Sequence, residues 1–287
     1  MFLMKNDCQI VWFKKDLRIY DHKPLEEAYK SNIPTIPIYV FETDYWKQPF
    51  SSKRHWYFIH DCLLELQIEI KSINSELIIL KSDIIKVLNM INKKFNIVSI
   101  YAHEETSNLW TFKRDKMVAE WSRINKVNFY EFPSNGIIRK LENRNVWSSI
   151  RKDRMQKEIF KKPKNLIKLD HKIKSNLLRK DEKVFKENIF FSYQKGGRKI
   201  ALSLIKTFLN KNLDGYLKHI SGPNFSDKFC SRISPHLTHG TISIKEIYKI
   251  IDEFKKKCEL KGINLYKRGL SAFRSRLSLE MSFLFKS

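Results

Sequence analysis

The chain has 287 residues, of which 42% are hydrophobic, and a formal net charge of +24. This length and apolar content predict two domains, and the charge favours an anionic partner, although lysine is abundant throughout the chain. With 13% aromatic residues, nucleic acid is the preferred partner over a membrane surface. No apolar run approaches the ~20 residues of a membrane span, and the four scattered cysteines lack the paired spacing of a zinc site. We therefore expect reduced thiols in a cytoplasmic protein. The oligomeric state is left open, with a monomer as the preferred interpretation.

In the first ~135 residues, short apolar runs rich in β-forming residues alternate with longer amphipathic helical patterns. Strands are predicted at residues 8–13, 35–41, 77–80, 97–101 and 127–132, and helices at residues 23–31, 54–73, 84–94 and 110–124. The alternation predicts an α/β domain over residues 7–135, with a doubly wound, parallel five-stranded sheet and helices on both faces.

Ligands of such a sheet bind beyond the carboxyl ends of its strands. The loops after Phe13, Phe41 and Tyr101 are therefore expected at any binding crevice. No glycine-rich loop follows the first strand, so the sequence predicts neither a dinucleotide fingerprint nor a P-loop. Two neighbouring pairs of opposite charge are expected to form structural ion pairs, namely Asp16 with Arg18 and Arg114 with Asp115.

Residues 136–194 show weak periodicity and many lysines and arginines, which predicts a long basic linker. A solvated charged loop is the preferred interpretation, and a strap that contacts DNA phosphates is the alternative. Residues 195–287 contain only helical patterns, with apolar faces in 200–208, 247–254 and 270–284. They predict the first part of an all-helical domain, and we expect that domain to be incomplete because its last pattern reaches Ser287 without a stop signal.

The stretch CSRISPHLTHGTIS at residues 230–243 is the most informative part of the helical region. Ser231 and Ser234 precede Pro235, which predicts a hydroxyl-lined helix start that can hold a phosphate. Ser243 and Glu246 have the spacing of a capping box, so a second helix is expected to begin there. A serine-capped corner without a ligand is the alternative interpretation.

Two histidines, His236 and His239, lie in the same stretch. No further metal ligands accompany them in the sequence, and a metal site needs more than two. We therefore interpret both as ordinary core or surface histidines and predict no metal site.

The opening VWFKKDLRIYDHKPL, residues 11–25, resembles the signature with which the DNA photolyase and cryptochrome family begins. Further similar segments follow in family order: VFETDYW at 40–46, SSKRHWYF at 51–58, HEETSNLWTFKRDKMVAEW at 103–121, GIIRKLENRNVW at 136–147 and GGRKIALSLIKTFL at 196–209. The stretch at 230–243 resembles the entry to the flavin-binding domain of this family. The chain is thus identified as a member that is shortened within its FAD-binding domain.

The resemblance implies an FAD site in the helical region. Tyr216 would pack or hydrogen-bond near the cofactor. The diphosphate cradle would consist of Cys230, which contributes only its backbone, together with Ser231, Arg232, Ile233 and Ser234. The first domain carries a light-harvesting antenna chromophore in some relatives. No antenna is assigned here, because the chain around Trp110 and Thr111 lacks the Asn-Glu pair that holds a folate.

The resemblance also implies light-driven repair of pyrimidine dimers in damaged DNA, by electron transfer from reduced FAD. Two positions depart from the family pattern: Leu279, beside Glu280, replaces the tryptophan that stacks on the lesion, and Ile220 replaces a basic residue. Arg274 and Arg276 are candidate DNA contacts, with ordinary surface charge as the alternative. The competing hypotheses are a cryptochrome-like light sensor and a remnant without flavin, and we expect the 287 residues alone to be inactive.

Overall fold

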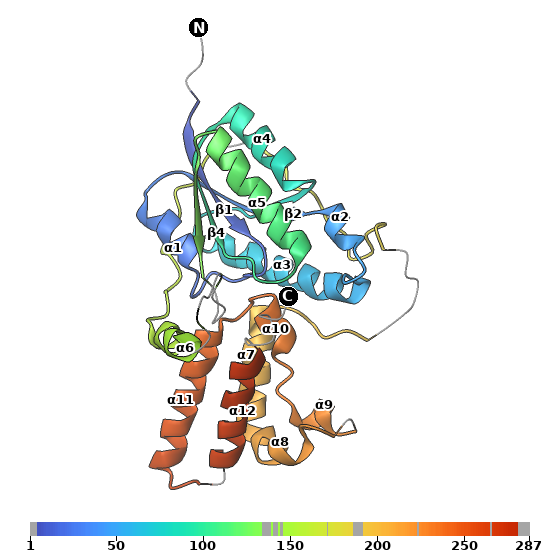
Figure 1. Cartoon of the computed structure of the whole chain (residues 1–287), viewed down its shortest axis with the longest axis vertical. Helices are drawn as coiled ribbons and strands as arrows, with labels where there is room; N and C mark the ends of the chain where they lie inside the picture. The colour runs from blue at the N-terminus through green and yellow to red at the C-terminus, as the bar shows by residue number, and fades with distance from the viewer. Residues whose placement is uncertain are drawn as a thin grey trace. The chain divides into compact units, whose positions relative to one another are not determined.

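The structure, a computed structural model, describes residues 5–133, 139, 143, 146–170, 172–185, 192–222, 224–264 and 266–280. The chain divides into two compact units (Figure 1). The α/β unit contains Met1–Ser134 and Phe160–Gly197, and the helical unit contains Asn135–Ile159 and Arg198–Ser287.

The α/β unit is built on a five-stranded sheet. Its strands are β1 (Asp7–Phe13), β2 (Thr35–Phe41), β3 (Ile78–Lys81), β4 (Asn96–His103) and β5 (Asn128–Phe132). Its helices are α1 (Lys23–Lys30), α2 (Thr43–Trp46), α3 (Lys53–Lys71), α4 (Ile84–Lys94) and α5 (Leu109–Ile124). Neighbouring strands pair in parallel in the order β3-β2-β1-β4-β5, which confirms the predicted doubly wound fold.

The side chains of β1 alternate between the two faces of the sheet, and both faces are buried. Val11 and Phe13 belong to a core shared with α1 and α3. Ile10 and Trp12 belong to a second core, shared with α4 and α5. This double burial explains why β1 reads as a continuous apolar run rather than as an alternating one.

The second half of the predicted linker packs against the α/β unit. Pro163, Leu166 and Leu169 are buried at intervals of three residues, while the lysines between them are exposed. Further along, the backbone N–H of Asn176 donates to the carbonyl of Ile79 in β3 at 2.7 Å. Because β3 is an edge strand, this segment covers a row of backbone groups that would otherwise be open to pairing with another chain.

The residues predicted as one linker are thus divided between the two units. Residues 160–170 and 172–185 are anchored to the α/β unit by their apolar side chains, whereas α6 (Trp147–Gln156) belongs to the helical unit. Buried residues that recur at every third position match neither the period of a helix nor that of a strand. The sequence patterns therefore did not reveal that this segment packs against the α/β unit.

All regular elements described after Gly197 are helical. They are α7 (Arg198–Thr207), the π-helical turn η2 (Phe208–Asn212), α8 (Leu213–His219), α9 (Ser226–Phe229), α10 (Ser234–Thr238), α11 (Ile244–Leu260) and α12 (Tyr266–Glu280). Their apolar faces meet in one core, in which α12 approaches α8 closely at Gly269. A Cβ atom on Gly269 would lie only 2.5 Å from the carbonyl oxygen of Leu213. Within the described part of the chain, we find no helix with the length and apolarity needed to cross a membrane.

Candidate functional site

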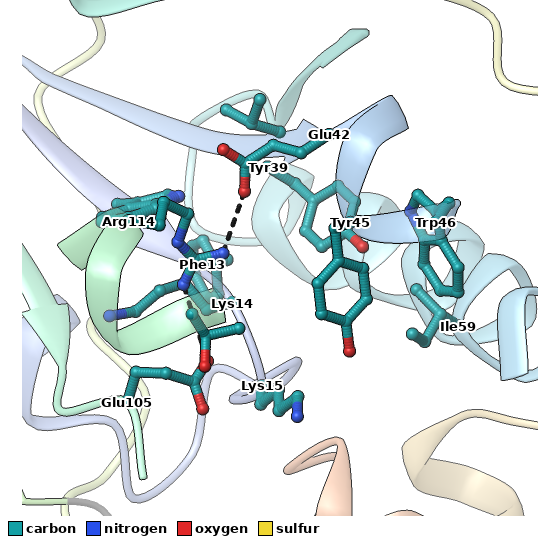
Figure 2. Close-up of a pocket in the computed structure, with 13 residues that line it drawn as sticks. Phe13, Lys14, Lys15, Tyr39, Glu42, Tyr45, Trp46, Ile59, Glu105 and Arg114 are labelled. Carbon is teal, nitrogen blue, oxygen red and sulfur yellow. Dashed lines mark hydrogen bonds and ion pairs between the residues drawn. The ribbon is translucent and has the colours of Figure 1, made fainter. Parts of the chain in front are cut away.

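A pocket opens at the carboxyl ends of β1, β2 and β4, the edge of the sheet at which the sequence places a binding crevice (Figure 2). The loop after β1 contributes Lys14 and Lys15, the residue after β2 is Glu42, and Glu105 follows β4. The remaining lining residues are Trp12, Phe13, Tyr39, Val40, Tyr45, Trp46, Ile59, Thr111 and Arg114.

Arg114 of α5 is the centre of the charged side of the pocket. Its guanidinium donates to Glu42 Oε2 at 3.0 Å and to Asp115 Oδ1 at 2.9 and 3.0 Å, and it lies 3.6 Å from Glu105 Oε2. Lys14 Nζ reaches the other oxygen of Asp115 at 2.6 Å. The predicted ion pair between Arg114 and Asp115 is therefore confirmed, within a network that includes residues from three strand ends.

Burial and charge set the pKa values of this network. Although burial alone would raise the pKa of Asp115, Lys14 and Arg114 hold it below its usual value. Burial raises the pKa of Glu42, and the charge of Arg114 opposes that rise. The arginine remains protonated because three carboxylates surround it.

Aromatic rings form the opposite side of the pocket. Trp46 is 5% exposed and stacks on Phe41 with ring centroids 5.6 Å apart. The ring of Tyr45 meets Trp46 edge-on at 5.2 Å and Trp110 at 5.3 Å. Figure 2 shows Tyr45 and Trp46 side by side on α2, facing the cavity from the side opposite Arg114.

Beneath the loops after β1 and β4 lies a buried cluster of Asp16, His22 and His103. Asp16 Oδ2 lies 2.9 Å from His22 Nε2 and 2.7 Å from His103 Nδ1, and Asp16 Oδ1 accepts the backbone N–H of Lys14 at 2.7 Å. Burial lowers the pKa of His103 to about 3 and also lowers the pKa of His22. Although burial alone would raise the pKa of Asp16, the two histidines hold it well below its usual range.

The ligand atoms of these three side chains are close enough to hold a metal ion. The backbone N–H of Leu25 donates to His22 Nδ1 at 3.1 Å, so Nδ1 carries a lone pair and the proton lies on Nε2, which faces Asp16. A metal-bound histidine normally donates through its second nitrogen, whereas here that nitrogen accepts. The cluster is therefore a hydrogen-bonded support for the two loops, with Asp16 as the shared acceptor.

The residues that the sequence assigns to FAD lie in the helical unit. Tyr216 is 3% exposed and packs edge-on against Phe208 and Phe273. Ile233 belongs to the same apolar core, and Cys230 packs against it. The structure thus brings Tyr216, Cys230 and Ile233 together as core residues.

The other three cradle residues lie toward the surface, where Arg232 and Ser234 are exposed and Ser231 is half-buried. Arg232 has a left-handed backbone with φ of 55°, and Ile233 follows with φ of −86° and ψ of −13°. A left-handed residue followed by a right-handed one turns successive N–H groups toward a common point, which is an arrangement that binds anions. The backbone at 232–234 and the two serines therefore fit a phosphate group.

The predicted serine cap of α10 is wrong. Ile233 is the N-cap residue of this helix, no side chain caps it by a hydrogen bond, and Ser234 is already helical. The cause is the burial of Ile233 in the core, which holds its backbone in the helical region one residue earlier than the serine pattern indicates. His236 follows in this helix, buried, with Nδ1 2.9 Å from Thr241 Oγ1, and burial lowers its pKa to about 4.

The predicted capping box of α11 is confirmed. Glu246 N–H donates to Ser243 Oγ at 3.1 Å, Ser243 N–H donates back to Glu246 Oε2 at 2.9 Å, and Arg198 also binds this carboxylate.

We expect Ser243→Ala to lower the free energy of unfolding of the helical unit by about 1 kcal/mol, because one helix-end N–H loses its acceptor. Urea unfolding followed by circular dichroism measures this loss. Thr238→Ala, at an exposed position in α10, is the control and should change stability by less than about 0.5 kcal/mol.

The two predicted DNA contacts lie on α12 and differ in their surroundings. Arg274 Nη1 donates to Asp252 Oδ1 at 2.5 Å, so a carboxylate neutralises much of its charge. Arg276 is exposed. Of the two, Arg276 has the environment that suits a phosphate contact.

Sequence reasoning placed the pocket but missed most of its residues. Glu42 directly follows β2, and Glu105 lies two residues after the end of β4, which is a signal that could have identified them. Tyr45 and Trp46 lie in a helix of four residues that has no readable periodicity. The partners of Asp16 could not be found from spacing, because His103 is 87 residues away.

Comparison with known proteins shows what this chain is similar to. The DNA photolyase family matches residues 9–145. The chloroplastic/mitochondrial cryptochrome DASH of Solanum lycopersicum is 24% identical over 293 residues, which cover 86% of this chain and 49% of that protein.

Two solved structures share the fold. The cryptochrome of Synechocystis sp. aligns with 99% of this chain and 62% of its own, with a TM-score of 0.79 and 17% identity. The archaeal photolyase of Sulfolobus tokodaii, solved with two FAD molecules, aligns with 85% of this chain and 54% of its own, with a TM-score of 0.61 and 22% identity. This chain therefore spans between 49% and 62% of the length of these three proteins. Its signature motifs, its α/β fold and the family match together show that residues 9–145 of this chain belong to the DNA photolyase family.

Proposed function

We propose that this chain is an FAD-binding protein of the photolyase type, which repairs pyrimidine dimers in DNA with the energy of light. The observation that carries the proposal is the family match over residues 9–145. The net charge of +24 supports an anionic partner such as DNA. The solved archaeal relative with two FAD molecules supports the choice of cofactor.

The left-handed turn at Arg232 is the feature of the helical unit that fits FAD. A non-glycine residue in this conformation costs about 1–3 kcal/mol and is concentrated at ligand sites. The backbone N–H groups of 232–234 would hold the diphosphate, and the hydroxyls of Ser231 and Ser234 would add hydrogen bonds to it. Bound FAD would supply the light-driven electron transfer to the lesion, while the protein positions the flavin and the DNA.

The first test is the visible spectrum of the purified chain after incubation with FAD. We expect a flavin absorbance band that stays with the protein through gel filtration. Light-dependent loss of thymine dimers from an oligonucleotide is then measured on the same sample, and such a loss would contradict the expected inactivity of the 287 residues alone. A protein fraction that remains colourless would refute flavin binding by these residues. Flavin binding without loss of dimers would refute repair and leave the family membership intact.

The two cradle serines offer a sharper test of the site. We expect the double variant Ser231→Ala/Ser234→Ala to weaken FAD binding about thirtyfold, since each of the two hydroxyl hydrogen bonds contributes about 1 kcal/mol. Titration of FAD fluorescence against protein measures the dissociation constant. Thr238→Ala is the matched control, because it removes an exposed hydroxyl at the other end of α10. Equal affinities of the wild type and the double variant would place the diphosphate elsewhere.

Blue-light sensing is the second candidate function. The Solanum lycopersicum relative is a cryptochrome, and Leu279 stands where the resemblance expects the tryptophan that stacks on a lesion. Leucine cannot stack on a base as an aromatic ring does. Restoring the aromatic side chain by Leu279→Trp should improve binding to a dimer-containing oligonucleotide if the protein repairs DNA, and should have no effect on binding if it only senses light.

A further inference from the structure

The pocket at the carboxyl end of the sheet is too small for a fused-ring chromophore. Some family members carry a second, light-harvesting chromophore, and the Sulfolobus tokodaii photolyase was solved with two FAD molecules and an implicated light-harvesting cofactor. The cavity here has a volume of about 40 Å³. Pockets that bind organic ligands have roughly 300–1,000 Å³, so this cavity has room for little more than water.

The apolar half of the pocket is filled by two rings of the chain itself. Trp46 is fixed from three sides, by Phe41 at 5.6 Å, Trp56 at 5.5 Å and Phe185 at 5.6 Å between ring centroids. Tyr45 packs in turn on Trp46. Both rings lie on α2, directly after β2, where a ligand of a doubly wound sheet would sit.

Tyr45 also contacts two aromatic residues on its other sides. Its ring centroid lies 5.3 Å from that of Trp110 and 5.4 Å from that of Phe50. Three aromatic rings thus contact Trp46 and two others contact Tyr45, in addition to the contact between the pair. A rotamer change of either ring would disrupt several of these ring contacts. The two rings form a fixed part of the wall.

The charged half of the pocket offers no unpaired cation for a phosphate. The Arg114 guanidinium is surrounded by the carboxylates of Glu42, Glu105 and Asp115, and Lys14 is paired with Asp115 at 2.6 Å. The ammonium of Lys15 donates to the hydroxyl of Ser107. A phosphate-bearing chromophore would have to displace these carboxylates, and a buried arginine separated from its partners costs several kcal/mol.

We propose that Tyr45 and Trp46 act as a built-in aromatic plug, so that the α/β unit of this protein holds no fused-ring chromophore at the end of its sheet. The side chains occupy the place of the ligand, and the charges that line the rest of the pocket are neutralised among themselves. Any light-harvesting chromophore of this protein then binds at another place, and the sheet-end pocket has a structural role.

The experiment compares lumiflavin binding by the full-length wild type and the double variant Tyr45→Ala/Trp46→Ala. Lumiflavin has the tricyclic flavin ring and no phosphate, so the measurement reports the shape of the pocket alone. Equilibrium dialysis gives the number of molecules bound per chain. We expect the opened variant to bind one more lumiflavin per chain than the wild type. A lumiflavin site in the helical unit contributes equally to both proteins, so a failure of the proposed FAD site does not affect this difference.

Trp121→Ala is the matched control, because Trp121 is also a buried tryptophan of the α/β unit but belongs to the core on the other face of the sheet. The control should bind as many lumiflavin molecules as the wild type. Equal numbers for the wild type and the opened variant would overturn the proposal, and so would an equal gain in the control. Should the double variant lack a cooperative unfolding transition, Tyr45→Leu/Trp46→Leu, which removes both rings but keeps apolar side chains, serves as the opened protein, with the same two outcomes.

Discussion

Asp16→Asn is expected to lower the free energy of unfolding of the α/β unit by about 3–5 kcal/mol. Asp16 is 1% exposed and accepts hydrogen bonds from His22, His103 and the backbone N–H of Lys14. An asparagine side chain has a single acceptor oxygen, and its amide group would face a histidine N–H donor. Removal of one partner from a buried charged network leaves donors without acceptors, which is the costly case.

The measurement is urea unfolding followed by tryptophan fluorescence, since five of the six tryptophans lie in the α/β unit. Asp44→Asn is the matched control, because the Asp44 side chain is 80% exposed and pairs only with Lys47 among the described salt bridges. The control should cost less than about 0.5 kcal/mol. A loss below about 1 kcal/mol for Asp16→Asn would mean that other contacts hold the loops of the pocket.

The second large effect is the loss of stability of the α/β unit between pH 6.5 and pH 4. Burial lowers the folded-state pKa of His103 to about 3 and also lowers that of His22, so both rings take up protons at lower pH in the folded state than in the unfolded chain, where uptake begins below pH ~6.5. The unfolded state then binds more protons, and stability falls as the pH falls. Two such histidines give a slope of up to about 2.7 kcal/mol per pH unit.

Asp16 and Glu42 of the same unit also have shifted pKa values, in opposite directions. The lowered pKa of Asp16 keeps its contribution to stability intact until the pH falls below the ordinary range of a carboxyl group. The raised pKa of Glu42 acts in the opposite direction to the histidines, because the folded state then binds the extra proton. The slope of the wild type alone therefore does not isolate His103.

His103→Asn isolates this residue, because an asparagine amide can still donate to Asp16 but does not titrate. The pH slope of the variant should be smaller than that of the wild type by up to about 1.4 kcal/mol per pH unit. Urea unfolding at several pH values measures both slopes. Parallel curves for the two proteins would show that His103 is charged in the folded state.

The architecture of the α/β unit was predictable because its signals are local. Strand periodicity, helix caps and turns lie within a few residues of one another, and the predicted ends of β1 and β4 lie within two residues of the observed ends. The position of the pocket also followed from the sequence, because the rule about carboxyl ends needs only the order of strands and helices. The resemblance to photolyases placed the same segments independently.

The details of the site were not predictable because its contacts join residues far apart in the chain. Arg114 binds Glu42 across 72 positions, and Asp16 binds His103 across 87. No spacing rule identifies such partners from one sequence. The start of α10 was mispredicted for the related reason that the burial of Ile233 outweighed a local serine signal. The FAD assignments at Tyr216 and 230–234 remain predictions that rest on the resemblance.

The covering of β3 by the distant segment at residues 175–176 affects how this protein is made. Backbone groups of Ile79 and Lys81 bond to Ser175 and Asn176, which follow them by 95 to 97 positions. At a synthesis rate of about 5–20 residues per second, β3 leaves the ribosome roughly 5–20 seconds before the segment that covers it. During that interval the nascent sheet has an open edge, so slow translation of residues 82–176 would prolong its exposure to aggregation and to chaperones.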